Sequence, residues 1–263
     1  MLQKNTLKSL NTIKKFFAIL GFLIIGLGII LFITIQIVNE DIPKIISTKQ
    51  SQQKASELIQ KSLVAFNQQA WKKTVAIEFS FRDKIYHLWY KKKNLSIVEW
   101  GSDDNRYKVM LNTKTIRGKV WHNKVLLKEK RTVQKYLKKA YSYHTNDTFW
   151  LNPILHANSP GAKVDLIKND KSQRKVLVSY TSGGVTPGDS YLFDFNLNGS
   201  LDSMKMWVSI LPVKGVKATF VNYKKYANGL LASNIRKIWF LKLNLVGLKF
   251  YTSAQEIEKQ FLH

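Results

Sequence analysis

The stretch that decides the fold runs from Ser182 to Val208 and reads SGGVTPGDSYLFDFNLNGSLDSMKMWV. Its middle alternates between large apolar or aromatic side chains and other residues with a period of two, which is typical of a half-buried strand. Asn198-Gly199 follows this run, and an Asn-Gly pair between two alternating segments is a strong hairpin signal. The stretch therefore predicts two antiparallel strands joined by a tight turn.

The first residues of this stretch resemble a phosphate-binding loop, with Gly183 and Gly188 at the expected spacing. The lysine that would meet the phosphates is replaced by Asp189, which would repel them. A working loop of this kind also opens a helix, whereas an alternating strand follows here. We therefore expect a turn rather than a nucleotide site, formed by the residues Gly184, Pro187, Gly188, Asp189 and Tyr191.

A second false signal lies in DFNLNG, Asp194 to Gly199, which matches the opening of a calcium-binding EF-hand loop. The twelfth position of such a loop requires a bidentate glutamate, and it is Lys205 in this chain. The histidines are scattered without metal-ligand spacing. The sequence predicts no metal site and no cofactor.

Working outward, most of the chain has the same strand-like alternation. Strand-like runs are expected at 74–82, 84–91, 94–101, 106–112, 118–124, 162–169, 174–181, 190–197, 203–211, 216–226 and 235–245. Helical spacing of apolar residues predicts helices at 51–69 and at 132–146, with Thr132 as the N-cap of the second, and a short terminal helix at 253–262. Because helices do not alternate regularly with strands, we expect an α+β fold with one antiparallel sheet and helices packed on one face.

The N-terminal region predicts a membrane anchor. Residues 16–38 are uncharged and long enough to cross a hydrocarbon core of about 30 Å, and no small-residue cleavage site follows them. Four lysines precede the run and two acidic residues follow it, which places the N-terminus in the cytoplasm. The expected organisation is a cytoplasmic segment at 1–15, the anchor at 16–38, a linker at 39–54 and an extracytoplasmic domain at 55–263 of a single-pass inner-membrane protein.

Composition narrows the function classes further. The chain has 263 residues, 42 Lys and Arg against 17 Asp and Glu, a formal net charge of +25 and no cysteine. Disulfides, thiolate metal sites and a cysteine nucleophile are excluded. Lysine dominates the basic residues, whereas base-specific readers of nucleic acid rely on arginine, so we expect no nucleic-acid partner. The basic surface instead favours anionic lipid head groups.

Three segments together carry a resemblance to a known family. They are Asn146-Asp147-x-Phe149-Trp150-Leu151 with Pro160-Gly161, then Gly184-Val185-Thr186-Pro187-Gly188-Asp189-x-Tyr191, and Met206-Trp207-Val208. Over residues 55–235 the chain resembles a family of uncharacterised bacterial envelope proteins whose fold is similar to that of the lipoprotein carriers LolA and LolB. The resemblance implies a strongly curved antiparallel sheet, like an opened barrel, with helices on its concave side. It also implies a hydrophobic cavity for an acyl chain or another lipid-like ligand.

The leading hypothesis is a non-enzymatic, membrane-anchored envelope protein that binds a lipid or the acyl chain of a lipoprotein in a cavity between sheet and helices. The expected ligand-binding residues are Phe149, Trp150, Met204, Met206, Trp207 and Val208. Two alternatives stay open. One is a ligand-free scaffold or protein-interaction module with a closed core. The other is an enzyme acting on an envelope lipid or glycan, for which Asp147, His144 and Asp189 are the only nominated cluster.

Overall fold

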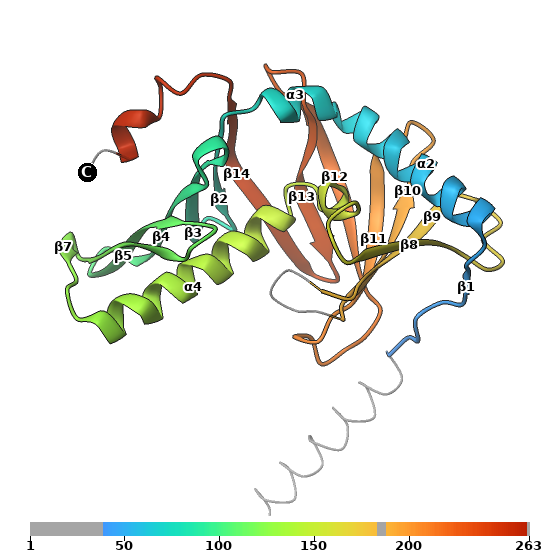
Figure 1. Cartoon of the computed structure of the whole chain (residues 1–263), viewed down its shortest axis with the longest axis horizontal. Helices are drawn as coiled ribbons and strands as arrows, with labels where there is room; N and C mark the ends of the chain where they lie inside the picture. The colour runs from blue at the N-terminus through green and yellow to red at the C-terminus, as the bar shows by residue number, and fades with distance from the viewer. Residues whose placement is uncertain (1–38, 183–187, 262–263) are drawn as a thin grey trace, which may run out of the picture.

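The computed structural model describes residues 39–182 and 188–261, which form one large antiparallel sheet with few helices (Figure 1). The strand order is β1-β8-β9-β10-β11-β12-β13-β14-β2-β3-β4-β5-β6-β7, and every neighbouring pair is antiparallel. The expectation of a single antiparallel sheet is confirmed. The predicted anchor at 16–38 lies outside the described residues, and none of the helices within 39–182 and 188–261 has the length and apolar character needed to cross a membrane.

The strands fall into two continuous runs of the sheet. The first run precedes the long helix α4 (Lys130–Phe149) in the sequence. It comprises β2 (Ala76–Phe81), β3 (Ile85–Tyr90), β4 (Leu95–Ser102), β5 (Asn105–Asn112), β6 (Arg117–His122) and β7 (Val125–Leu126). The run after α4 comprises β8 (Ala162–Ile167), β9 (Lys175–Tyr180), β10 (Ser190–Phe195), β11 (Leu201–Trp207), β12 (Val216–Lys225), β13 (Leu231–Ile238) and β14 (Leu241–Tyr251). The short β1 (Ile45–Ile46) pairs with β8 at one edge.

The segment expected as a linker at 39–54 is part of the folded unit. It contains β1 and the start of helix α2 (Lys49–Phe66). Thr48 begins the helix, because its hydroxyl accepts from the Ser51 N–H at 3.1 Å while the Ser51 hydroxyl accepts from the Thr48 N–H at 2.9 Å. Asn67 ends α2 with a left-handed φ of 68° and caps α3 (Gln68–Lys73), so the predicted single helix at 51–69 is two helices.

Helix α4 (Lys130–Phe149) is longer than the predicted 132–146, and the expectation that Thr132 caps it is wrong. Glu129 caps it instead, because its two carboxylate oxygens accept from the backbone N–H groups of Arg131 at 2.7 Å and Thr132 at 2.6 Å. A carboxylate at this position also complements the positive end of the helix dipole.

Helices α2 and α4 cover the same face of the sheet. Phe79, His87 and Val98 are direct cross-strand neighbours, so their side chains share a face. Phe79 belongs to the core that includes α2, and Val98 belongs to the core beneath α4. The opposite face is covered in part by the C-terminal segment, where Ile257 is buried against β2, β3 and β4.

Two elements near the C-terminus differ from those predicted from the sequence. The predicted strand at 235–245 is wrong as a single element, because the chain turns at Trp239 and Phe240 and pairs β13 with β14, with Ile238 opposite Leu241. Trp239 adopts a left-handed φ of 51° at this turn. The predicted terminal helix is reduced to a short 3-10 helix, Glu258–Phe261.

Candidate functional site

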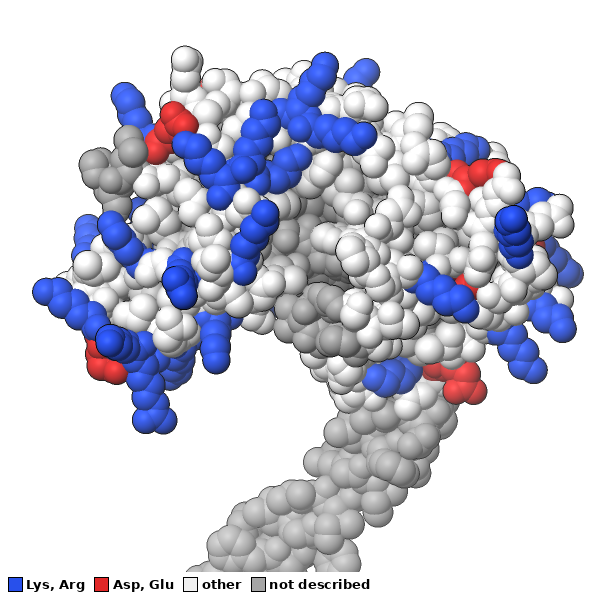
Figure 2. All heavy atoms as spheres, viewed as in Figure 1, with Lys and Arg blue, Asp and Glu red and all other residues white. Residues whose placement is uncertain are grey.

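A large apolar cleft of about 640 Å³ lies where several strands end beneath the C-terminal turns of α4. The surface is hollowed near the centre of the face shown in Figure 2. The cleft is lined by Phe81, Arg82, Ser142, Tyr143, Thr145, Asn146, Phe149, Trp150, His156, Ser159, Pro160, Tyr180, Ser182, Asp189, Tyr191, Met206, Val208, Ile210, Leu211, Ile238 and Leu243. Its volume is in the range typical of small-molecule and lipid sites.

The helix side of the cleft is formed by the end of α4. Phe149 is the last helical residue and packs against the ring of Tyr191, with 5.0 Å between ring centroids. Trp150 follows and stacks on Phe220 of β12 at 6.4 Å. Both aromatic side chains line the cleft, as the sequence-based hypothesis requires. They supply apolar surface with few rotatable bonds to immobilise.

The sheet side of the cleft shows which of the predicted β11 residues face it. Met206 and Val208 line the cleft, whereas Met204, two residues earlier on the same face, is fully buried in the core and does not. Trp207 does not line it either. Because successive side chains of a strand point to opposite faces, Trp207 points away from Met206, and its indole N–H donates to the Glu40 carbonyl oxygen at 2.7 Å. This hydrogen bond holds the first described residues against the face of the sheet opposite to Met206.

Three residues of the predicted motif turn, Gly188, Asp189 and Tyr191, are described, and Asp189 and Tyr191 line the cleft. The Gly188 N–H donates to the Tyr180 carbonyl oxygen at 2.8 Å, and Gly188 has a φ of 94°, a conformation that favours glycine. The buried Asp189 carboxylate accepts from the Ser209 N–H at 3.0 Å and from the Tyr191 hydroxyl at 3.3 Å. Gly184 and Pro187 lie outside the described residues. A strand, β10, follows the motif, which agrees with the rejection of a nucleotide site.

Three polar side chains in the cleft were not singled out by the sequence. Tyr180 points a hydroxyl group into a buried position where it has no hydrogen-bond partner among the described residues, and burial raises its pKa. Burial also lowers the pKa of His156, so its imidazole is neutral at physiological pH. Arg82 lines the cleft from an exposed position. Tyr180 could have been placed near the motif by the hairpin register, but the other two come from segments that only the fold brings together.

Beneath α4 lies a buried polar cluster that bears on the enzyme hypothesis. His87 Nε2 lies 2.7 Å from Asp147 Oδ2, and His144 Nδ1 lies 3.1 Å from the Ser96 hydroxyl. The pKa of His144 is lowered to about 3, mainly by burial and to a smaller extent by the nearby His87. His144 and Asp147, both predicted, therefore lie in one cluster with His87, which the sequence analysis missed, while Asp189 lines the cleft in contact with Ser209 and Tyr191.

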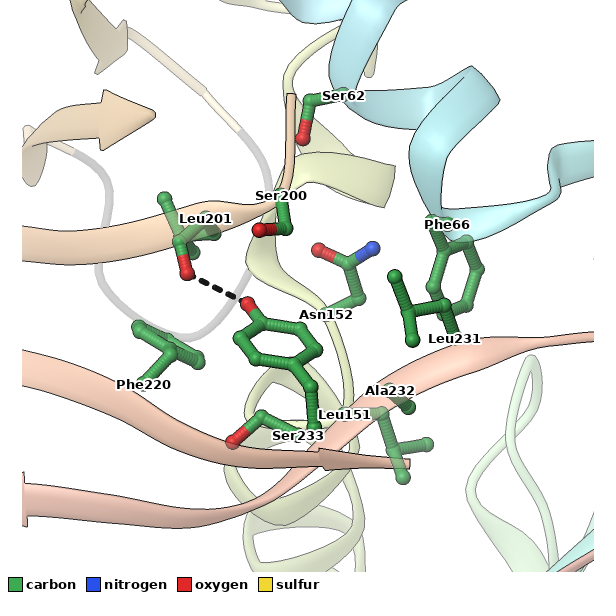
Figure 3. A pocket seen from close by; sticks show the side chains of 11 residues that line it. Ser62, Phe66, Leu151, Asn152, Ser200, Leu201, Phe220, Leu231, Ala232 and Ser233 are labelled. Carbon is green, nitrogen blue, oxygen red and sulfur yellow. Dashed lines mark hydrogen bonds between the residues drawn. The ribbon is translucent and has the colours of Figure 1, made fainter. Parts of the chain in front are cut away.

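A second cavity lies deeper, between α2 and strands β11 to β13 (Figure 3). It measures about 20 Å³, which is room for about one water molecule. Its lining includes Ser62, Asn152 and Tyr223, and the Tyr223 hydroxyl donates to the Leu201 carbonyl oxygen at 2.6 Å. A cavity of this size cannot hold an organic ligand. The larger cleft is the candidate site.

Comparison of the chain with protein-family models, with curated proteins and with solved structures gives no match. The site must therefore be interpreted from its own chemistry. Within residues 39–182 and 188–261, no group of three or more His, Asp or Glu side chains is arranged to hold a metal ion. The cleft offers aromatic and aliphatic surface together with the phenols of Tyr143, Tyr180 and Tyr191. It also offers a neutral imidazole, a carboxylate and an arginine at the rim.

Proposed function

We propose that the protein binds a lipid or lipid-like ligand in the cleft, without catalysing a reaction on it, as a LolA/LolB-like domain of the bacterial envelope anchored in the inner membrane by residues 16–38. The observation that carries this proposal is the cleft of about 640 Å³ with its predominantly aromatic and aliphatic lining. Each buried CH₂ group of an acyl chain contributes about 0.8 kcal/mol to the binding free energy. Burial of several CH₂ groups of a lipid acyl chain in the cleft would therefore hold the lipid there.

The polar groups of the cleft suit the head of an amphipathic ligand. Arg82 at the rim can pair with an anionic group, and the Tyr180 hydroxyl can donate one hydrogen bond to a carbonyl or phosphate oxygen. The rest of the lining offers dispersion and hydrophobic contacts that do not specify the shape of the chain closely. Met206 adds to this tolerance, because methionine adapts to varied partners.

The proposal is tested by photo-crosslinking in membranes that contain the full chain and a phospholipid with a diazirine on its acyl chain. Adducts are expected on the peptides that contain 142–150 and 206–211, because these segments line the cleft. Adducts on 16–38 are expected in any case from the predicted anchor and serve as an internal control. Adducts confined to 16–38 would refute ligand binding in the cleft.

A matched pair of variants links the adducts to the cleft itself. Ser142 is exposed and lines the cleft, whereas Lys138 lies one helical turn earlier on α4, is exposed, and does not. Ser142→Trp should fill part of the cleft and reduce crosslinking several-fold, while Lys138→Trp should leave it unchanged. Equal crosslinking in the two variants would show that the lipid binds elsewhere.

The scaffold alternative requires a closed core. The open apolar cleft therefore supports ligand binding rather than a ligand-free scaffold. The enzyme alternative calls for an acid or base that meets the ligand. His144, Asp147 and His87 are buried, and Asn146 links them to the cleft through its side-chain N–H, which donates to Asp147 Oδ1 at 2.8 Å. This arrangement favours a structural role for the cluster.

A further inference from the structure

The cleft lies at one end of the sheet. Tyr180 is the last residue of β9, Ile238 the last of β13, and Phe81 the last of β2. Tyr191 and Leu243 lie near the starts of β10 and β14. Because the end of one strand and the start of the next meet at the same end of an antiparallel sheet, all these positions lie together. The cleft therefore faces the end of the sheet that carries the β11–β12 and β13–β14 connections.

The described chain begins at this same end. The Asn39 side-chain oxygen accepts from the Lys214 N–H at 2.7 Å, and the Glu40 N–H donates to the Lys214 carbonyl oxygen at 3.3 Å. Lys214 belongs to the connection between β11 and β12, which lies beside the first described residues at the lower end of the sheet in Figure 1. The predicted anchor ends at residue 38, so these contacts leave almost no chain between the anchor and this end of the sheet.

Large apolar side chains are exposed at this end in both connections between strands. Ile210 in the β11–β12 connection is 68% exposed, and Trp239 and Phe240 at the β13–β14 turn are 60% and 87% exposed. Thr219 pairs with Lys237, and Met206 pairs with Val216, so both connections project from the same end. A bulky residue such as Trp239 is unfavourable at its left-handed φ of 51°, which indicates that the turn geometry alone did not select it.

We propose that this end of the sheet docks on the lipid bilayer, with Ile210, Trp239 and Phe240 inserted at the level of the head groups and the cleft opening toward the lipid. Tryptophan is favoured at this depth, and exposed apolar side chains at a tip are typical of interfacial insertion. Lys237 and Lys242 flank the turn and are exposed, which favours a bilayer that contains anionic lipid. Docking is a property separate from ligand binding. It rests on the proposed function in one respect, because it makes the bilayer the source of the ligand.

The test uses the absence of cysteine from the chain, since one introduced thiol can carry a single spin label. Phe240→Cys labels the docking end. Leu197→Cys is the matched control, because Leu197 is 78% exposed at the β10–β11 turn, at the opposite end of the sheet. The full chain is reconstituted in vesicles of phosphatidylcholine and phosphatidylglycerol. Collisions of each label with oxygen, which concentrates in the bilayer, and with a water-soluble nickel complex are then measured.

Docking predicts a several-fold higher ratio of oxygen to nickel collisions at 240 than at 197. Equal ratios at the two positions would overturn it. Shielding of position 240 from both reagents, with broadening between labels, would also overturn it in favour of self-association. A chain that does not integrate into the vesicles would overturn it as well, because the anchor is what holds this end at the surface.

A second measurement separates docking from ligand binding. The double variant Trp239→Ser and Phe240→Ser should lower lipid crosslinking in the cleft several-fold, and Leu197→Ser should not. One outcome is a high ratio of oxygen to nickel collisions at position 240 together with no lipid adducts in the cleft of the unmodified chain. This outcome would support docking and refute the proposed ligand. Adducts in the cleft that do not depend on Trp239 and Phe240 would retain the ligand and refute uptake through this end.

Discussion

The imidazole Nε2 of His87 on β3 lies 2.7 Å from Oδ2 of Asp147 on α4, and both side chains are buried. His87 Nδ1 has no hydrogen-bond partner among the described residues. An N–H at Nε2 fits this contact, since it donates to the carboxylate oxygen and is not left unpaired in the buried site. This contact joins the sheet to α4 over sixty positions of sequence.

The costs of removing the two partners should therefore be less than additive. We expect Asp147→Ala to lower the free energy of unfolding by about 3 kcal/mol, because it leaves the buried His87 N–H unpaired. In a double-mutant cycle with His87→Ala, the coupling should be about 1 kcal/mol or more. Denaturant unfolding followed by tryptophan fluorescence measures both quantities, and additive effects would contradict the contact.

His144 predicts an acid-sensitive fold. Its pKa is lowered to about 3 by burial and by His87, against an ordinary value of about 6.5 in the unfolded chain. The unfolded state thus binds more protons below pH 6.5, so the stabilisation is complete above that pH. It is lost as the pH falls toward 3, by up to about 1.4 kcal/mol per pH unit.

The variant His144→Gln keeps a polar partner for Ser96 and should flatten this pH dependence. Part of the slope should remain, because burial lowers the pKa of His156 in the same direction. Unfolding free energies measured at several pH values between 7 and 4 check the expectation. An unchanged slope in the variant would assign the effect to other groups.

Arg236 is fully buried on β13 with a single hydrogen bond, from Nη2 to the Leu151 carbonyl oxygen at 3.0 Å. Its Nε and Nη1 have no partner among the described residues, and burial lowers its pKa to about 9. Because an under-compensated buried charge is costly, Arg236→Met should cost less than about 1 kcal/mol or stabilise the fold. A loss of more than about 3 kcal/mol in thermal or chemical unfolding would show that the guanidinium has a stronger partner.

Tyr180→Phe should separate stability from binding. The Tyr180 hydroxyl has no partner among the described residues, so its removal should leave the unfolding free energy nearly unchanged. If the hydroxyl donates to the ligand, affinity should fall by about 0.5–1.5 kcal/mol. Titration with a fluorescent fatty acid measures the loss.

The control for this prediction is Tyr223→Phe, which removes a hydroxyl that donates to the Leu201 carbonyl oxygen outside the cleft. It should lower stability by about 1 kcal/mol and leave affinity unchanged. A binding loss of the same size in both variants would argue against contact between Tyr180 and the ligand.

The local part of the fold could be predicted from the sequence, because side-chain alternation marks strands such as β2 and β10 directly. The turn at Trp239 and Phe240 was missed, since the local sequence Ile238-Trp239-Phe240-Leu241 contains no glycine, proline or asparagine. The start of α4 was misplaced because a glutamate cap is less common than a threonine cap. These errors arise where the tertiary fold overrides local preference.

The candidate site was predictable only in part. Phe149, Trp150, Met206 and Val208 line the cleft, and Met204 does not because it lies deeper in the core. The placement of Trp207 could have been improved from the sequence, because adjacent residues of one strand face opposite sides. Tyr180 could have been placed beside the motif from the β9–β10 hairpin. The positions of His87 and His156 could not have been predicted, because only the tertiary fold brings their segments to α4 and to the cleft.

The two edges of the sheet are its shortest strands, with β1 (Ile45–Ile46) at one side and β7 (Val125–Leu126) at the other. Exposed strand edges are templates for pairing with other chains, and very short edge strands blunt them. Here β1 belongs to the segment that joins the folded unit to the N-terminal region, so the same few residues that make this connection also protect β8. Proteolysis just after Ile46 would both separate the folded unit from the predicted anchor and open an edge to aggregation.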